Sequence, residues 1–227
     1  MTTAPIPTAA SAVPQLSQRL REGTREVHEA IEQGASFNRL IVVRIPDDDS
    51  APKERARVEY REIYRRFLIA SYGFELAIRT RLETSPAFSV ALAAGYATEI
   101  DDPVARIEDD LVGLGVHDPG PFGIMTGLPE APTLAEWVGI DYVRRGSRAG
   151  GAVIAAAVVH NLGLTRESGA GFLGMYGKDT RRVLTAMRAW IDSLPLEGAD
   201  ADRAVAAAVA TFEATGAWHK LLEESFQ

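Results

Sequence analysis

The sequence predicts an all-α protein with a single domain. Apolar residues recur with helical periodicity, alternating Val, Ile and Thr runs between Asn-Gly turns are absent, and no change of composition marks a domain boundary. We expect seven or eight helices in an irregular bundle over residues 16–227. Residues 1–15 are small, polar and Pro-containing, so we expect a disordered tail there.

The first half of the chain divides at its prolines and aspartates. Apolar and small residues form one broad face over 16–32, which predicts a helix. Residues 37–53 contain two prolines and three successive aspartates, which indicates a loop. A long amphipathic helix is expected over 54–83, with Pro86 after its end. Shorter helices are expected over 87–97 and 101–114.

The second half begins with a loop over 117–133, which holds four prolines and three glycines. Thr133 then opens a helix with Glu136 three residues later, the spacing of a capping box. This helix is predicted to reach about Leu162. Two further helices are expected over 177–194 and 200–225.

Composition excludes several kinds of function. The chain has no cysteine, which rules out thiolate metal sites and cysteine nucleophiles and fits a cytoplasmic protein. A net charge of −7 argues against a nucleic-acid partner. No apolar run reaches the roughly 18 residues that a membrane helix needs, and the first residues lack the basic start of a secretory signal.

Four histidines are candidates for chemistry, and His28 differs from the others. It lies mid-helix beside the apolar face, with Glu32 one turn later, where a carboxylate can orient an imidazole. His117 lies in the Pro/Gly loop, where we expect it to be exposed. His160 lies near a helix end, and His219 lies on the last helix with partial exposure expected.

Three other chemistries find no support in the motifs. The sequence has no G-x-S-x-G turn for a serine nucleophile. None of the histidines follows a glutamate at the Glu-x-x-His spacing of di-iron bundles. The segment GSRAGG is neither a Walker sequence nor preceded by a predicted strand.

The stretch GSRAGGAVIAAAVVH, residues 146–160, places three glycines in a predicted helix. Each costs about 1 kcal/mol relative to alanine in a helix interior. Gly146 and Gly150 share one face, and Gly151 follows them. Such a face suits either close packing of another helix or the approach of a flat ligand to the backbone. Opposite His28, it would form a narrow slot for a planar macrocycle.

These features resemble the heme oxygenase family. The similar segments are LREGTREVHEAIE at 20–32, YRRFLIASYGFE at 64–75 and DYVRRGSRAGGAVI at 141–154. In the first, Thr24 and Glu32 lie four residues before and after His28, as in the proximal helix of the family. The third matches the pattern Y-x-x-x-G-S-x-x-G-G of the bacterial, biliverdin-producing branch.

The resemblance implies a heme slot between a proximal and a kinked distal helix. His28 would be the axial ligand of the heme iron, supported by Glu32. The catalytic wall would comprise Gly146, Ser147, Gly150 and Gly151. Heme b would be both cofactor and substrate, cleaved with O₂ and reducing equivalents to biliverdin, CO and Fe²⁺.

The implied partners are charged or bilin-binding. The electron donor would be a ferredoxin, a flavodoxin or a reductase, and the bilin acceptor a protein such as a bacteriophytochrome. The heme propionates call for cations. Arg21, two turns before His28, and Arg188 are the predicted propionate contacts, with Arg181 and Arg182 competing for the place of Arg188. Tyr142 is a further predicted heme contact. A basic patch for an acidic donor is predicted from seven arginines: Arg21, Arg144, Arg145, Arg148, Arg181, Arg182 and Arg188.

The chain departs from the family at Ser147, where some members have an aspartate that organises water. Arg148 and Ala149 replace a leucine-containing version of the motif, and 42–56 resembles an insertion relative to short bacterial members. Within the distal helix, Gly146 and Gly150 are expected to face the macrocycle. We expect the residues that continue the helix into the core to be Val153, Ile154 and Val158.

Two alternatives remain open at the level of sequence. A heme carrier or sensor on the same fold would need the same histidine and the same slot. A non-heme member of the helical superfamily would hold a metal or a small molecule in the pocket instead.

Overall fold

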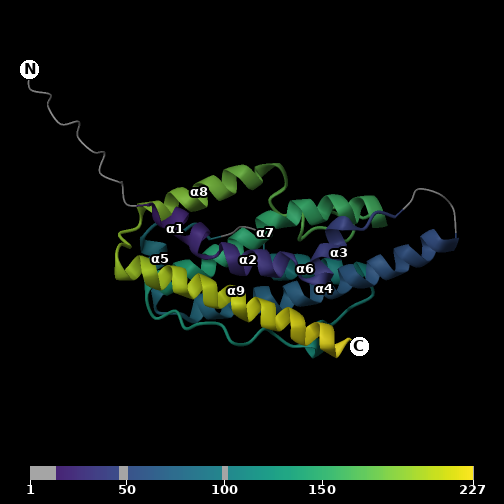
Figure 1. Ribbon diagram of the computed structural model, residues 1–227, viewed down its shortest axis with the longest axis horizontal. Coiled ribbons are helices and arrows are strands. Elements are labelled where there is room, and N and C mark those ends of the chain that lie inside the picture. Colours follow the sequence, from purple (N-terminus) through teal and green to yellow (C-terminus); the bar gives the residue numbers. More distant parts are fainter. Residues whose placement is uncertain (1–13, 46–50, 99–101, 227) are drawn as a thin grey trace, which may run out of the picture.

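The computed structural model describes residues 14–45, 51–98 and 102–226, and this part of the chain consists of helices and their connections (Figure 1). The α-helices are α1 (Leu16–Gly23), α2 (Arg25–Glu32), α3 (Ala35–Val42), α4 (Ala51–Thr84), α5 (Ala87–Ala93), α6 (Pro103–Gly113), α7 (Leu134–Leu162), α8 (Thr180–Ser193) and α9 (Ala199–Ser225). Two 3₁₀ turns, η1 (Gly120–Phe122) and η2 (Gly177–Asp179), lie in the connections. The all-α prediction is therefore confirmed.

Local end signals set the boundaries of the helices that the sequence predicts well. The Asp102 carboxylate accepts a hydrogen bond from the Val104 amide at 2.9 Å, which caps α6, and Pro103 occupies its first turn. At the end of α7, Gly163 adopts φ 68°, a left-handed conformation that glycine reaches without strain. The helix predicted to start at Thr133 accordingly runs unbroken from Leu134 to Leu162.

Two sequence predictions about the first half of the chain are wrong. The single helix expected over 16–32 is divided into α1 and α2 at Thr24, whose hydroxyl donates to the Leu20 carbonyl at 2.7 Å. Part of the loop expected over 37–53 is helical, in α3 and at the start of α4. Leu40 is fully buried there, and the Tyr60 hydroxyl donates to its carbonyl at 2.7 Å, so tertiary contacts stabilise a short helix that has weak local signals.

Smaller differences concern helix ends, and some expectations lie outside the described residues. α5 stops at Ala93, before Gly95 with φ 85°, rather than at residue 97. α8 begins only after the 3₁₀ turn η2. Residues 1–13 of the expected tail and 46–50 of the expected acidic loop and insertion are not among the residues described.

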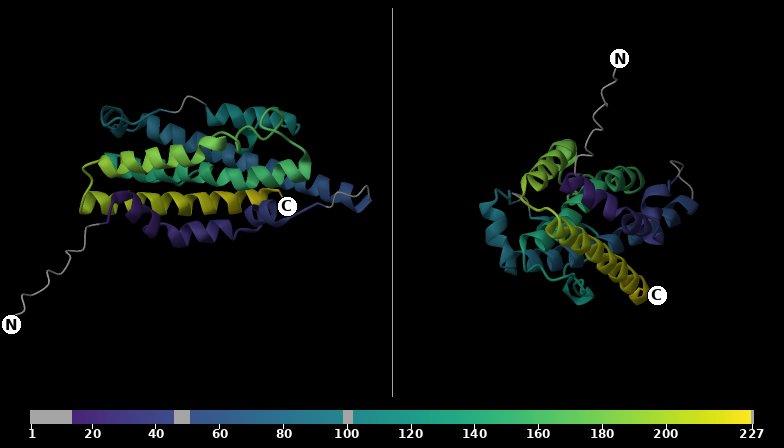
Figure 2. Two further views of the ribbon diagram at one scale, coloured as in Figure 1. Left: turned by 90° about the horizontal axis from the view of Figure 1, so that it is seen from above. Right: turned by 60° about the vertical axis from the view of Figure 1, so that its left-hand side comes forward.

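α7 is the central helix of the bundle, with α4 on one side and α9 on the other (Figure 2). Gly139 allows α7 and α9 to approach closely, since a Cβ atom there would lie 2.2 Å from the Ala204 carbonyl oxygen. Trp137 is fully buried on α7, and its indole N–H donates to the Leu82 carbonyl of α4 at 3.1 Å. The core therefore fixes α7 relative to both neighbours.

α1 and α2 pack along α9 and run in the same direction as α9. Arg19 pairs with Asp202 at 2.5 Å near the start of both segments, and Gly23 then faces Val205. The pairing of α2 with α9 fixes the position of α2 in the bundle. In the described part of the chain, we find no helix that is long and apolar enough to cross a bilayer.

Candidate heme site

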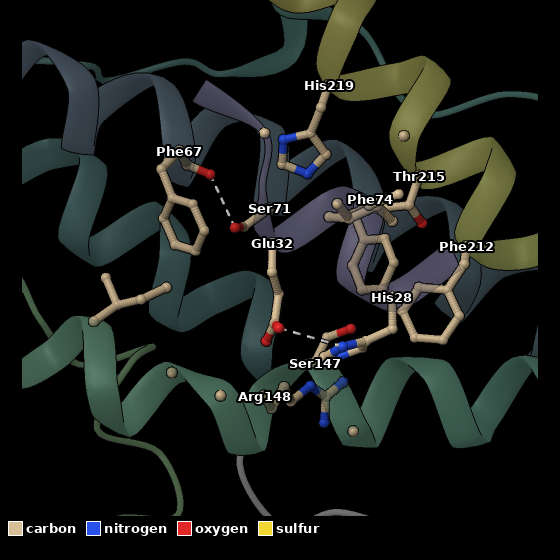
Figure 3. A pocket seen from close by; sticks show the side chains of 18 of the residues that line it. His28, Glu32, Phe67, Ser71, Phe74, Ser147, Arg148, Phe212, Thr215 and His219 are labelled. Carbon is tan, nitrogen blue, oxygen red and sulfur yellow. Dashed lines mark hydrogen bonds and ion pairs between the residues drawn. The ribbon is translucent and has the colours of Figure 1, made fainter. Parts of the chain in front are cut away.

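A cavity of about 600 Å³ opens between α2, α4, α7 and α9 (Figure 3). The floor and walls come from segments far apart in the sequence, including all three segments with family-like motifs. The residues that argue for its chemistry are His28, Glu32, Ser71, Glu75, Gly146, Ser147, Arg148, Gly150, Phe212 and His219. The volume is in the range of cavities that take a cofactor.

His28 reaches the cavity from α2, and its side chain is 46% exposed. Its Nδ1 atom lies 3.6 Å from a Glu32 carboxylate oxygen, close enough for the charge to favour a proton on Nδ1. The edge-on ring of Phe212 on α9 packs at 5.3 Å between centroids and restricts rotation of the imidazole. With Nδ1 turned toward Glu32, Nε2 is the nitrogen available to a metal.

Gly146 and Gly150 of α7 border open space, whereas Gly151 packs against another segment. A Cβ atom on Gly146 or on Gly150 would meet no heavy atom within 4 Å, and both residues line the cavity. A Cβ atom on Gly151 would lie 3.3 Å from the Leu173 carbonyl oxygen, so that residue serves close packing. Helix packing thus explains Gly151 but leaves the other two as a bare stretch of backbone. A flat macrocycle fits this wall, since added side chains would occupy the cavity.

Ile154 and Val158 continue α7 into the core as expected, at 1% and 0% exposure. The same expectation for Val153 is wrong, because that side chain is 58% exposed. Val153 lies three residues after Gly150, and residues at this spacing share a helix face. The exposed face of α7 therefore extends from the cavity past Val153. The structure shows one continuous helix here, and the kink remains a prediction.

Ser147 also borders the cavity, and its hydroxyl donates to the Val143 carbonyl one turn earlier at 2.8 Å. The hydroxyl proton is therefore held by the helix, while the oxygen lone pairs remain able to accept a hydrogen bond. Ser147 can help to hold a water molecule by accepting from it.

The cavity wall includes a buried ion pair that the sequence did not reveal. Glu75 of α4 is fully buried and accepts two hydrogen bonds from Arg148, from Nε and from one terminal nitrogen, both at 2.6 Å. Arg144 donates from Nε to the same carboxylate at 3.0 Å. This bidentate arrangement holds α7 against α4 directly behind the glycine wall. A glutamate with two arginines 69 and 73 residues away has no local sequence signal.

The basic patch predicted for an electron donor is wrong for three of its seven arginines. Arg144 and Arg148 are engaged by Glu75, and the side chains are 11% and 1% exposed. Arg145 lies 3.0 Å from Asp141, over the ring of Tyr96, with its side chain 10% exposed. These three guanidinium groups are largely buried and engaged by carboxylates inside the protein, so they do not form a docking surface.

A cationic cluster lies outside the residues that line the cavity, about one turn before the first cavity residues of α2 and α7 along these helices. Tyr142 of α7 lies in hydrogen-bonding contact with Thr24 of α2 and near Arg188 of α8 and Arg21 of α1. Burial raises the pKa of Tyr142, and the Thr24 contact and both guanidinium charges oppose that rise. Arg21 and Arg188 are exposed. The structure thus brings together Arg21 and Arg188, which are predicted to contact propionates, and Tyr142, which is predicted to contact heme.

The remaining histidines separate clearly. His117 and His160 are exposed, and neither lines the cavity. His219 does line it, from α9, where Figure 3 shows its ring directed toward the space beside Ser71 and Phe74. His219 is partly exposed, as predicted. No sequence signal indicates that it lies in the same cavity as His28.

This arrangement of helices defines the heme oxygenase fold, to which solved structures of heme oxygenases correspond over most of the chain. The heme oxygenase of Leptospira interrogans is 20% identical, with a TM-score of 0.69, and the match covers 92% of this chain and 100% of that one. Heme oxygenase-2 of Synechocystis, solved with heme and NO, is 19% identical, with a TM-score of 0.68 over 93% and 86% of the two chains. Heme oxygenase-1 of Synechocystis, solved with heme, gives 19% and 0.66 over 93% and 94%. No protein-family model and no curated protein sequence matches this chain.

Proposed function

We propose that this protein is a heme oxygenase of the bacterial, biliverdin-producing type, which cleaves heme with O₂ and reducing equivalents to biliverdin, CO and Fe²⁺. The observation that carries the proposal is the slot itself. An imidazole on α2 and a bare stretch of α7 backbone border one cavity, on a fold that known heme oxygenases share.

His28 is the proposed axial ligand through Nε2. Glu32 favours the tautomer with the proton on Nδ1, which leaves the Nε2 lone pair for iron. Phe212 limits the ring to a narrow range of orientations. Bound heme b supplies the iron at which O₂ reacts, and the protein determines where the macrocycle lies and what surrounds it.

The glycine wall keeps the opposite side of the slot open. Gly146 and Gly150 allow backbone to approach the face of the macrocycle and leave room for O₂ and water. Ser147 can accept a hydrogen bond from that water. Arg21, Arg188 and Tyr142 supply two positive charges and a hydroxyl for the propionates at the end of the slot.

An electron donor must also dock, and a ferredoxin, a flavodoxin or a reductase fits this need. Arg188 of the cationic cluster and Arg181 both lie exposed on α8, and they offer positive charge to an acidic donor. A bilin acceptor such as a bacteriophytochrome would take the product. Both partners place the reaction in the cytoplasm.

The test is hemin addition followed by turnover, with His28→Ala compared against His160→Ala. His160 is exposed at the end of α7, outside the cavity, so its variant controls for the loss of a histidine. We expect wild type and His160→Ala to give a ligated ferric heme spectrum, and to yield biliverdin with ascorbate or ferredoxin in air. His28→Ala should lose the absorption band of histidine-ligated heme and most of the biliverdin yield.

The outcomes separate the alternatives. An unchanged spectrum and an unchanged biliverdin yield in His28→Ala would remove the proximal assignment. Heme binding without bilin formation in the wild type would assign a carrier or a sensor. Failure of the wild type to bind hemin would overturn both and favour a non-heme ligand for the cavity.

A further inference from the structure

His219 occupies the opposite end of the slot from the cationic cluster. α9 runs parallel to α1 and α2, so positions along α9 can be read against α2. Phe212 contacts His28, and Gly216 faces Ile31, with 3.8 Å between a Cβ atom built on Gly216 and the Ile31 side chain. His219 lies seven residues beyond Phe212, about 10 Å further along the helix axis. The direction is away from Arg21, which precedes His28 by two turns.

The His219 imidazole has hydrogen-bonding capacity that its protein neighbours do not use. In the described part of the chain, neither ring nitrogen makes a hydrogen bond to protein, and the residue lines the cavity. Nearby, the Ser71 hydroxyl donates to the Phe67 carbonyl at 2.9 Å instead (Figure 3). Burial lowers the pKa of His219, and the charge of Glu223 only partly opposes this. A neutral imidazole offers one N–H donor and one acceptor.

The polarity of the slot sets which edge of a macrocycle meets His219. The two propionates of heme flank a single meso bridge, and the bridge diagonally opposite carries only apolar neighbours. If the propionates bind the cluster of Arg21, Arg188 and Tyr142, the opposite bridge points toward His219. An unpartnered imidazole has nothing to bond on that edge of intact heme. It gains a partner only when oxygen is introduced there.

Ring opening at a bridge creates such partners. The bridge carbon leaves as CO, and each of the two flanking pyrrole carbons gains one oxygen from O₂, so the linear product ends in two lactam groups. A lactam carbonyl accepts a hydrogen bond, and a lactam N–H donates one.

We propose that His219 hydrogen-bonds a lactam end of the product opened at the bridge opposite the propionates, and thereby favours binding of that bilin isomer. The proposal rests on the proposed function, since it takes the bound heme orientation from the cationic cluster. It makes His219 a residue that determines product specificity and not an iron ligand. The iron would lie at the level of His28, which contacts Phe212, and His219 lies about two helical turns beyond Phe212.

The experiment measures two affinities for each variant, one for hemin and one for biliverdin IXα, the isomer opened opposite the propionates. His219→Phe removes both hydrogen-bonding atoms and keeps a flat ring. We expect biliverdin affinity to fall about 2- to 12-fold, the range of one neutral hydrogen bond. Hemin affinity should change less than about 2-fold. His219→Gln, which keeps a donor and an acceptor, should restore most of the biliverdin affinity. His160→Phe, outside the cavity, is the matched control.

The outcomes separate the proposed role of His219 from the proposed heme oxygenase function. Equal losses of hemin and biliverdin affinity in His219→Phe, or no loss of either, would overturn the role of His219. A failure of the wild type to bind or cleave hemin would instead overturn the proposed function. Should His219→Phe not fold, NMR of the His219 ring nitrogens in the wild type decides. A biliverdin-induced shift that hemin does not cause supports the proposal, and its absence overturns it.

Discussion

Gly150→Ala should make the protein more stable and a poorer binder of hemin. A methyl group at this position would have no heavy atom within 4 Å, so it adds no clash. Alanine is more favourable than glycine in a helix interior by about 0.8–1.0 kcal/mol. In a domain of this size, 1 kcal/mol corresponds to roughly 2–4 °C in melting temperature. We therefore expect the ligand-free variant to melt about 2–4 °C higher.

Gly139 provides the contrast on the same helix. A methyl group there would lie 2.2 Å from the Ala204 carbonyl oxygen and 3.0 Å from the Ala207 Cβ atom, where α7 and α9 are tightly packed. Overpacking a tight interface costs about 1–3 kcal/mol, which exceeds the gain in helix propensity. Gly139→Ala should therefore unfold at lower temperature and lower denaturant concentration than the wild type.

The hemin titration completes the test. If the macrocycle lies on the bare α7 backbone, the methyl group introduced by Gly150→Ala occupies part of the space that the macrocycle needs. Hemin affinity then falls, although the variant protein is more stable. Thermal and urea unfolding of the ligand-free proteins measure the first effect, and absorbance titration measures the second. A Gly150→Ala protein that is less stable than the wild type contradicts the open geometry. One that binds hemin as tightly as the wild type contradicts the assignment of this wall to the macrocycle.

Two further predictions concern buried ionisable groups. Glu75→Leu leaves Arg148 without its carboxylate, and breaking a buried pair in this way should lower the free energy of unfolding by about 3–5 kcal/mol, measured in urea. Replacing Glu75, Arg144 and Arg148 together with apolar residues should recover much of that loss, and an equal or larger loss in the triple variant would refute the pairing. Below its ordinary pKa of 6.5, His219 takes up a proton more readily in the unfolded chain than in the folded one, because burial lowers its folded pKa. Stability should therefore fall as the pH drops from about 7.5 through 6.5, and His219→Phe should show a smaller fall; identical pH profiles would refute it. The charged or titratable side chains that share the cavity with His219 are His28, Glu32, Glu75, Arg148, Glu213, Lys220 and Glu223.

The sequence predicted α6 and α7 well because boundaries of both helices have local causes. The capping carboxylate of Asp102 marks the start of α6, and the left-handed Gly163 marks the end of α7. Both signals act over a few residues. The short α3 has no such signal. It exists because Leu40 is buried against α4 and bonded by Tyr60, which are contacts that no local pattern encodes.

The candidate site divides in the same way. His28 with Glu32, and Gly146 with Gly150, were predictable because each pair depends on spacing within one helix. The status of the arginines was not predictable. Arg148 follows Ser147 directly in the sequence, yet one is buried in an ion pair with a residue of α4 and the other borders open space. Burial of a charge depends on whether a partner from another helix meets it, and helical periodicity carries no information about that partner.

The chemistry available at the α7 wall follows from how its polar atoms are already used. The Ser147 proton goes to the Val143 carbonyl, and the carboxylate of Glu75 is occupied by guanidinium groups of Arg148 and Arg144. Where some heme oxygenases have an aspartate, this wall presents a hydroxyl oxygen that accepts and a carboxylate held in an ion pair. A water molecule that donates one proton to the Ser147 oxygen keeps its second proton available to donate toward the slot. In the proposed heme site, this arrangement favours proton donation through water over donation by a side-chain acid.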